Sequence, residues 1–135
     1  MAEGVFRHLV KEAGLEESFH IDSAGTDSYH EGETPDHRGM KVALSRGVSL
    51  TGQTARGLHV TDYGSFDYIF AMDNGHFSEI NARAPGGHSA KIEMFMGREV
   101  PDPWYGNEKD FELVYDLVLE GSAAILEQMR KEHQL

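Results

Sequence analysis

The sequence predicts an α/β fold in which helices flank a parallel β-sheet. Segments with helical periodicity alternate along the chain with short apolar runs, and this alternation is typical of parallel sheets. The length of 135 residues suits one domain with a single buried core. No internal repeat and no linker divides the chain, so we expect a single domain over residues 1–135.

The first helix is predicted over residues 1–15. Met1, Val5 and Leu9 line one face at helical spacing, and a glycine near the end provides a C-terminal stop. No Ser, Thr, Asp or Asn precedes Ala2 as an N-cap. Either the sequence opens in the middle of a motif, or a terminal helix simply frays.

Residues 18–26 are predicted to be a strand that runs into a Ser/Gly turn, and two apolar runs, over residues 67–72 and 89–95, are predicted to be strands. Further helices are predicted over residues 37–47, 59–66, 75–84 and 109–132. The last of them carries a long apolar stripe, and the basic residues near its end suit the helix dipole. Three strands are few for a parallel sheet, whose strands are normally covered and paired on both sides, so we expect one strand to be missing.

Composition excludes several classes of function. Twelve Lys and Arg against 23 Asp and Glu give a formal net charge of −11, which argues against nucleic-acid and anionic-membrane partners. No run approaches the roughly 20 apolar residues that span a bilayer. The absence of cysteine excludes disulfides, thiolate zinc sites and a cysteine nucleophile. Because the start of the sequence does not resemble a signal peptide, a cytoplasmic location is expected.

The segment VPDPWYG, residues 100–106, places one carboxylate between two prolines. The flanking prolines disfavour a helical backbone at Asp102 and predict a stiff loop, and Trp104 and Tyr105 follow directly. Such a loop suits a general acid that faces an aromatic substrate. From the residues alone, a solvent-exposed turn with both aromatic residues as core anchors is the alternative.

Other polar residues favour structural roles. Asp73 is expected to cap the helix that follows it. Arg38 and Arg56 are the only basic candidates for an anion site, and solvent exposure is expected for both. One loop gathers several potential metal ligands, but their spacing matches no tight metal motif, so neither a metal nor a cofactor is expected; they are His30, Glu31, Asp36 and His37.

Five motifs, in order along nearly the whole chain, resemble the low-molecular-weight protein-tyrosine phosphatases. They are MAEGVFRHL, IDSAGT, FDYIFAMD, VPDPWYG and FELVYDLV. The Asp-Pro-aromatic-Tyr-Gly element is specific to that family and favours it over the arsenate reductases that share its fold. The resemblance implies a three-layer α/β fold, phosphotyrosine phosphatase I-like, with a parallel sheet between layers of helices.

The resemblance also implies roles for four residues. Asp102 corresponds to the general acid that protonates the leaving tyrosine oxygen and then activates water. Trp104 and Tyr105 correspond to walls of the slot for the phosphotyrosine ring, although Trp104 stands where the family often has Tyr. Ser23 corresponds to a serine that supports the phosphate-binding loop, with a turn hydroxyl as the alternative. The implied substrate is a phosphotyrosine protein or a small aryl phosphate.

In that family a central strand leads into a C-x5-R-[ST] loop, whose thiolate attacks phosphorus while its arginine and backbone N–H groups hold the phosphate. The present sequence opens at the Met that would follow this loop. We therefore expect the central first strand, the nucleophile and the arginine to be missing, and no phosphatase activity from this chain alone.

The missing strand would lie between the predicted strands 18–26 and 67–72. Its loss is expected to expose two strand edges and the apolar face of the first helix, at a cost on the order of several kcal/mol. A homo-oligomer, or exchange of elements between chains, would cover the edges.

Three hypotheses follow: a phosphatase truncated at an internal Met, a natural inactive relative that binds or oligomerises, or an interaction domain on the same scaffold. The coding DNA upstream of Met1 discriminates the first from the other two.

Overall fold

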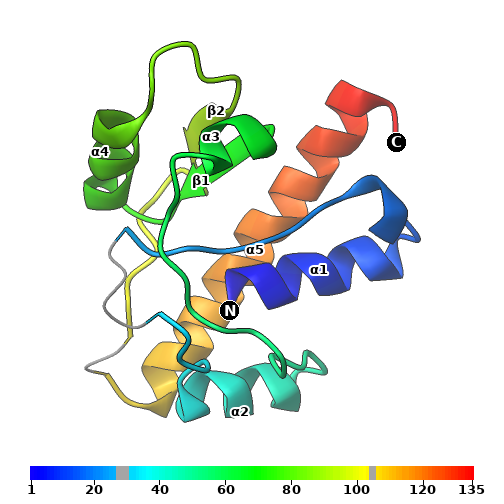
Figure 1. Cartoon of the computed structure of the whole chain (residues 1–135). Helices are drawn as coiled ribbons and strands as arrows, with labels where there is room; N and C mark the ends of the chain where they lie inside the picture. Colours follow the sequence, from blue (N-terminus) through cyan, green and yellow to red (C-terminus); the bar gives the residue numbers. More distant parts are fainter. Residues whose placement is uncertain (27–30, 104–105) are drawn as a thin grey trace.

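The computed structural model describes residues 1–26, 31–103 and 106–135 and confirms the α/β fold (Figure 1). Within these ranges it has five α-helices, one 3-10 helix and two strands. In chain order they are α1 (Ala2–Glu12), η1 (Glu16–Ser18), α2 (His37–Ser45), α3 (Asp62–Ser65), β1 (Tyr68–Ala71), α4 (Asn74–Arg83), β2 (Lys91–Met94) and α5 (Glu108–His133).

The two strands form a parallel pair joined by α4. Ile69 of β1 lies opposite Ile92 of β2. The amide of Lys91 donates to the carbonyl of Asp67 at 2.9 Å, and the amide of Phe95 donates to the carbonyl of Ala71 at 2.8 Å. Parallel strands need a crossover connection, which α4 supplies, so this unit is the part of the predicted sheet that the structure confirms.

The prediction of a strand over residues 18–26 is wrong. Ser18 ends η1, and residues 19–24 belong to no strand; the chain makes one isolated parallel bridge, between Gly25 and Gly57. The amide of Gly25 donates to Arg56 at 2.8 Å, and the amide of Leu58 donates to Gly25 at 2.9 Å. An apolar run becomes a strand only where a neighbour pairs with it along its length, and no described strand lies alongside this one.

Helix α5 organises the main core, because α1 and α2 both pack against it (Figure 1). Val5 and Val10 of α1 are 0% and 1% exposed. The expectation that the apolar face of the first helix is exposed is therefore wrong, since α5 supplies its packing partner. Gly39 allows a close approach of α2, because a Cβ there would lie 3.3 Å from the ring of Phe111.

Side-chain caps begin three of the helices. Asp73 caps α4 by accepting a hydrogen bond from the amide of His76 at 2.7 Å, as predicted. Asp36 caps α2, and Asn107 begins α5 with a capping box in which Asp110 bonds back to the Asn107 amide. Helix α1 begins without a side-chain cap, in agreement with its sequence. These caps satisfy amides that have no partner within the helix.

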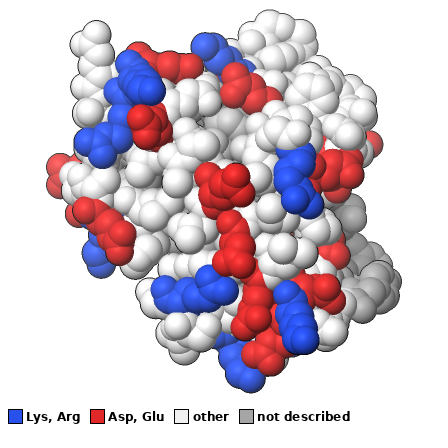
Figure 2. Space-filling model, turned by 180° about the vertical axis from the view of Figure 1, so that it is seen from behind, with Lys and Arg blue, Asp and Glu red and all other residues white. Residues whose placement is uncertain are grey.

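The surface carries mixed charge. On the face drawn in Figure 2, acidic side chains lie among the basic ones, and the basic ones do not gather into one continuous area. In the part of the chain that the structure describes, no helix is long and apolar enough to cross a membrane. The same part contains no group of three or more His, Asp or Glu side chains arranged to hold a metal ion.

Candidate active site

Asp102 lies in the connection between β2 and α5, in residues 100–106. This segment is fixed before the carboxylate, where the amide of the buried Val100 donates to the carbonyl of Met72 at 2.7 Å. It is fixed again after it, where the amide of Gly106 donates to the carbonyl of Pro103 at 2.7 Å. Between these points the Asp102 side chain is exposed. An exposed carboxylate on a loop held at both ends suits proton transfer to a bound ligand.

Trp104 and Tyr105, the predicted walls of the substrate slot, lie outside the described residues. Their predicted role therefore stays a prediction. His30, one of the potential metal ligands considered in the sequence, also lies outside the described residues.

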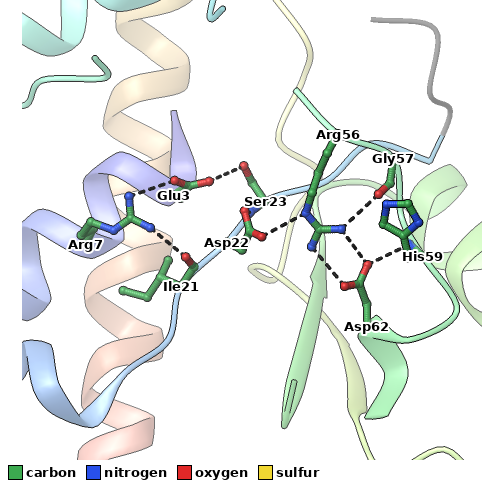
Figure 3. Close-up of polar contacts among 9 residues, drawn as sticks. All are labelled: Glu3, Arg7, Ile21, Asp22, Ser23, Arg56, Gly57, His59 and Asp62. Carbon is green, nitrogen blue, oxygen red and sulfur yellow. Dashed lines mark hydrogen bonds and ion pairs between the residues drawn. The ribbon is translucent and has the colours of Figure 1, made fainter. Parts of the chain in front are cut away.

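Ser23 lies in a hydrogen-bond chain that ties residues 21–23 to helix α1 (Figure 3). Its hydroxyl donates to Glu3 Oε1 at 2.7 Å. The other oxygen of Glu3 accepts from Arg7 Nη1 at 3.0 Å, and Arg7 Nη2 donates to the carbonyl of Ile21 at 2.7 Å. Ser23 thus has a structural partner that the sequence did not predict, 20 residues away. Its support of a phosphate loop stays a prediction.

Arg56 lies in a second polar cluster, next to the first (Figure 3). Its Nε donates to Asp22 Oδ2 at 3.0 Å, and its two terminal nitrogens donate to the two oxygens of Asp62 at 2.9 and 3.2 Å. The Asp62 carboxylate also accepts from the amide of His59 at 2.8 Å. The expectation of a solvent-exposed arginine is wrong, because the Arg56 side chain is only 24% exposed and binds two carboxylates.

The electrostatics of the Arg56 cluster favour the charged form of both partners. Burial by itself raises the pKa of Asp62, but the hydrogen bonds from Arg56 and from the His59 amide outweigh it, so the pKa is lowered overall. The hydrogen bond to Asp62 raises the pKa of Arg56. All three guanidinium nitrogens are already engaged by the protein, so Arg56 is poorly placed to bind phosphate.

Arg38 was also expected to be exposed, and its side chain is 38% exposed but ion-paired. Its Nη2 lies 2.9 Å from Asp36 Oδ2, its Nη1 donates to the carbonyl of Gly106 at 2.6 Å, and the guanidinium lies over the ring of Phe111. Both arginines that the sequence offered as anion ligands are therefore ion-paired within the fold.

Comparison with known proteins identifies the family of this chain. The sequence model described as "Low molecular weight phosphotyrosine protein phosphatase" matches residues 1–135. The chain belongs to this family. A low molecular weight phosphotyrosine protein phosphatase of Schizosaccharomyces pombe is 42% identical over 119 residues, which cover 82% of this chain and 76% of that protein. The human protein of the same name is 34% identical over 136 residues, covering 95% of this chain and 85% of that protein.

The fold of this low molecular weight phosphatase relative matches solved structures as well. A crystal structure of a protein tyrosine phosphatase from Entamoeba histolytica, with Hepes in its active site, superposes with a TM-score of 0.90. The identity is 37%, and the match covers 99% of this chain and 89% of that one. The 135 residues of this family member contain no cysteine.

Proposed function

We propose that this chain is a tyrosine-phosphatase scaffold that carries the proton donor Asp102 but does not hydrolyse phosphate esters by itself. One observation carries the proposal: the family model matches residues 1–135, and those residues contain no cysteine. The family's chemistry forms a covalent phosphocysteine, and a carboxylic acid that protonates a leaving group contributes little without that attack.

The polar contacts of the two arginines support this proposal. A substitute phosphate cradle needs cationic donors that are not already neutralised. Arg56 is held by Asp22 and Asp62, and Arg38 is held by Asp36. In this proposal Asp102 is the general acid, Trp104 and Tyr105 flank the ring of a phosphotyrosine or a small aryl phosphate, and Ser23 corresponds to the serine that supports the phosphate-binding loop.

The experiment pairs binding with turnover on one ligand. A phosphotyrosine peptide is titrated into the chain by calorimetry, and phosphate release from the same peptide is followed by a colorimetric assay. We expect no phosphate release above the buffer rate. Release that is abolished in Asp102→Asn contradicts the proposal. Heat of binding without release favours an inactive relative that binds phosphoproteins.

The open edge of β1 favours a second role, in self-association. The carbonyls of Asp67 and Ala71 point to β2, so the peptide groups of Tyr68 and Phe70 face the opposite edge. No strand pairs with that edge within the described ranges. Unpaired strand edges invite pairing with another chain, and we propose that a second copy covers this one.

Sedimentation equilibrium across a range of protein concentrations tests the association. We expect a dimer or a larger species whose fraction rises with concentration. A folded monomer at every concentration contradicts the association and leaves the proposal about catalysis intact.

A further inference from the structure

Arg38 joins three parts of the fold through one guanidinium group. Its Nε and Nη2 donate to the two oxygens of Asp36 at 3.0 and 2.9 Å, in a bidentate pair. Its Nη1 points the other way and donates to the carbonyl of Gly106 at 2.6 Å, 68 residues along the chain. Its Cζ lies 4.6 Å from the centre of the Phe111 ring. Because the guanidinium is planar and its donors are fixed relative to one another, the Asp36 pair sets the direction of the bond to Gly106.

Asp36 is itself held in place. The same carboxylate caps α2, because Asp36 Oδ1 accepts from the amide of Arg38 at 2.8 Å. The hydrogen bond from Arg38 lowers the pKa of Asp36, which favours the charged form of this carboxylate. The contact to Gly106 therefore originates from the rigid N-terminus of a helix whose Gly39 packs against α5.

Gly106 connects Arg38 to Pro103, the residue that follows Asp102. Its carbonyl accepts from Arg38, and its amide donates to the carbonyl of Pro103 at 2.7 Å. A Cβ at this position would lie 2.8 Å from the Cβ of Asp110, so only glycine fits between the segment and the start of α5. Pro103 follows Asp102 directly, and its ring limits the backbone of that residue. A contiguous set of described contacts thus runs from Arg38 through Gly106 and Pro103 to Asp102.

We propose that Arg38 is the positioning residue of the 100–106 segment: it holds the C-terminal end of the segment so that the Asp102 carboxylate is presented in one place. The value of this position for catalysis or ligand binding rests on the proposed function of Asp102. The position itself does not, and it is measured without any phosphate ester.

Arg46, the C-cap residue at the opposite end of α2 from Arg38, provides a matched control. Its side chain is 38% exposed, as is that of Arg38. It pairs with Asp116 at 2.9 Å and lies 5.0 Å from the centre of the Tyr115 ring. Both arginines therefore combine a carboxylate with an aromatic face, but the Arg46 guanidinium donates to Asp116 of α5.

The test follows the amide of Gly106 by hydrogen exchange in NMR, in Arg38→Ala, Arg38→Lys and Arg46→Ala. We expect the exchange rate of the Gly106 amide to rise about tenfold or more in Arg38→Ala. The charge-assisted hydrogen bond from Arg38 to the Gly106 carbonyl is then lost, so the end of the segment opens more often. In Arg38→Lys, which retains charge and fold but cannot make the fork, we expect a rise of about threefold. In Arg46→Ala we expect a change below about twofold. Emission from Trp104, the only tryptophan in the sequence and a member of the segment, is expected to shift in the Arg38 variants alone.

Unchanged exchange at Gly106 in both Arg38 variants overturns the proposal, and so does an equal rise in Arg46→Ala. If Arg38→Ala does not fold, Arg38→Lys alone decides between these outcomes. Phosphate release by the chain would contradict the proposed function and leave these exchange results unaffected, so the two failures are distinguishable.

Discussion

Replacement of Arg56 by alanine is expected to destabilise the fold through the carboxylate that it leaves behind. The Asp62 side chain is 10% exposed, and among its contacts with described residues the hydrogen bond from the His59 amide remains once the guanidinium is gone. Removal of one partner of a buried ion pair typically costs about 3–5 kcal/mol. Because Arg56 is 24% exposed, water reaches part of the site and reduces this cost, so we expect a loss of about 2–4 kcal/mol in the free energy of unfolding.

Urea unfolding of the wild type, Arg56→Ala, Asp62→Ala and the double variant measures this loss and the coupling between the two residues. We expect a coupling energy of about 1.5–3 kcal/mol, because both oxygens of Asp62 bond to Arg56. Arg46→Ala is the control, since its partner Asp116 is 59% exposed and an exposed ion pair contributes little to stability. A loss of stability in Arg56→Ala no larger than that in Arg46→Ala would show that Asp62 tolerates the loss of its cation.

The same pair predicts a pH dependence. The pKa of Asp62 is lowered in the folded state, because the hydrogen bonds outweigh the opposing effect of burial. A carboxyl group with a lowered pKa contributes stability above its unfolded pKa of about 3.9, and that contribution is lost as the pH falls through the folded value. The difference in stability between wild type and Arg56→Ala is therefore expected to be constant above about pH 5 and to shrink below about pH 4. A difference that grows in acid would contradict the assignment.

Three further predictions concern packing, capping and titration. Gly121→Val is expected to lower stability by about 1–3 kcal/mol in urea unfolding, because a Cβ at Gly121 would lie 2.8 Å from Phe95 Cδ2; an unchanged midpoint would be evidence against this contact. Asn107→Ala removes the capping box of α5 and is expected to cost about 1 kcal/mol, whereas Asn81→Ala, in an exposed position within α4, should cost less than about 0.5 kcal/mol. The hydrogen bond to Glu132 raises the pKa of Tyr68 to about 12, so an NMR titration of Tyr68 should move toward its ordinary value of about 10 in Glu132→Gln, and no movement would dismiss that hydrogen bond as the cause.

Most helices of this fold were predictable from the sequence, because the signals that define them are local. The helix predicted over residues 37–47 is observed as His37–Ser45, that over 75–84 as Asn74–Arg83, and that over 109–132 as Glu108–His133. Periodic apolar positions, an Asp cap and a glycine stop are all read within one or two turns.

The strands were less predictable because a strand depends on its neighbour. Residues 67–72 and 89–95 pair with one another, so both predictions are confirmed as β1 and β2. Residues 18–26 have no described partner along their length, and they form no strand.

The candidate site residues were predictable only where they lie in motifs that resemble the phosphatase family. Asp102 and Ser23 were found from motifs, and their roles stay predictions. The contacts of Arg38 with Gly106 and of Arg56 with Asp22 were missed, because these partners lie 68 and 34 residues away and no spacing signals such contacts. Glu3, which binds Ser23, was missed for the same reason.

Hydrolysis of p-nitrophenyl phosphate by the 135-residue chain, measured beside Asp102→Asn at equal concentration, tests the central claim most directly. We expect both proteins to release p-nitrophenol at the rate of the buffer alone, because the chain has no thiol to attack phosphorus. Steady release by the unaltered chain that Asp102→Asn removes would contradict it.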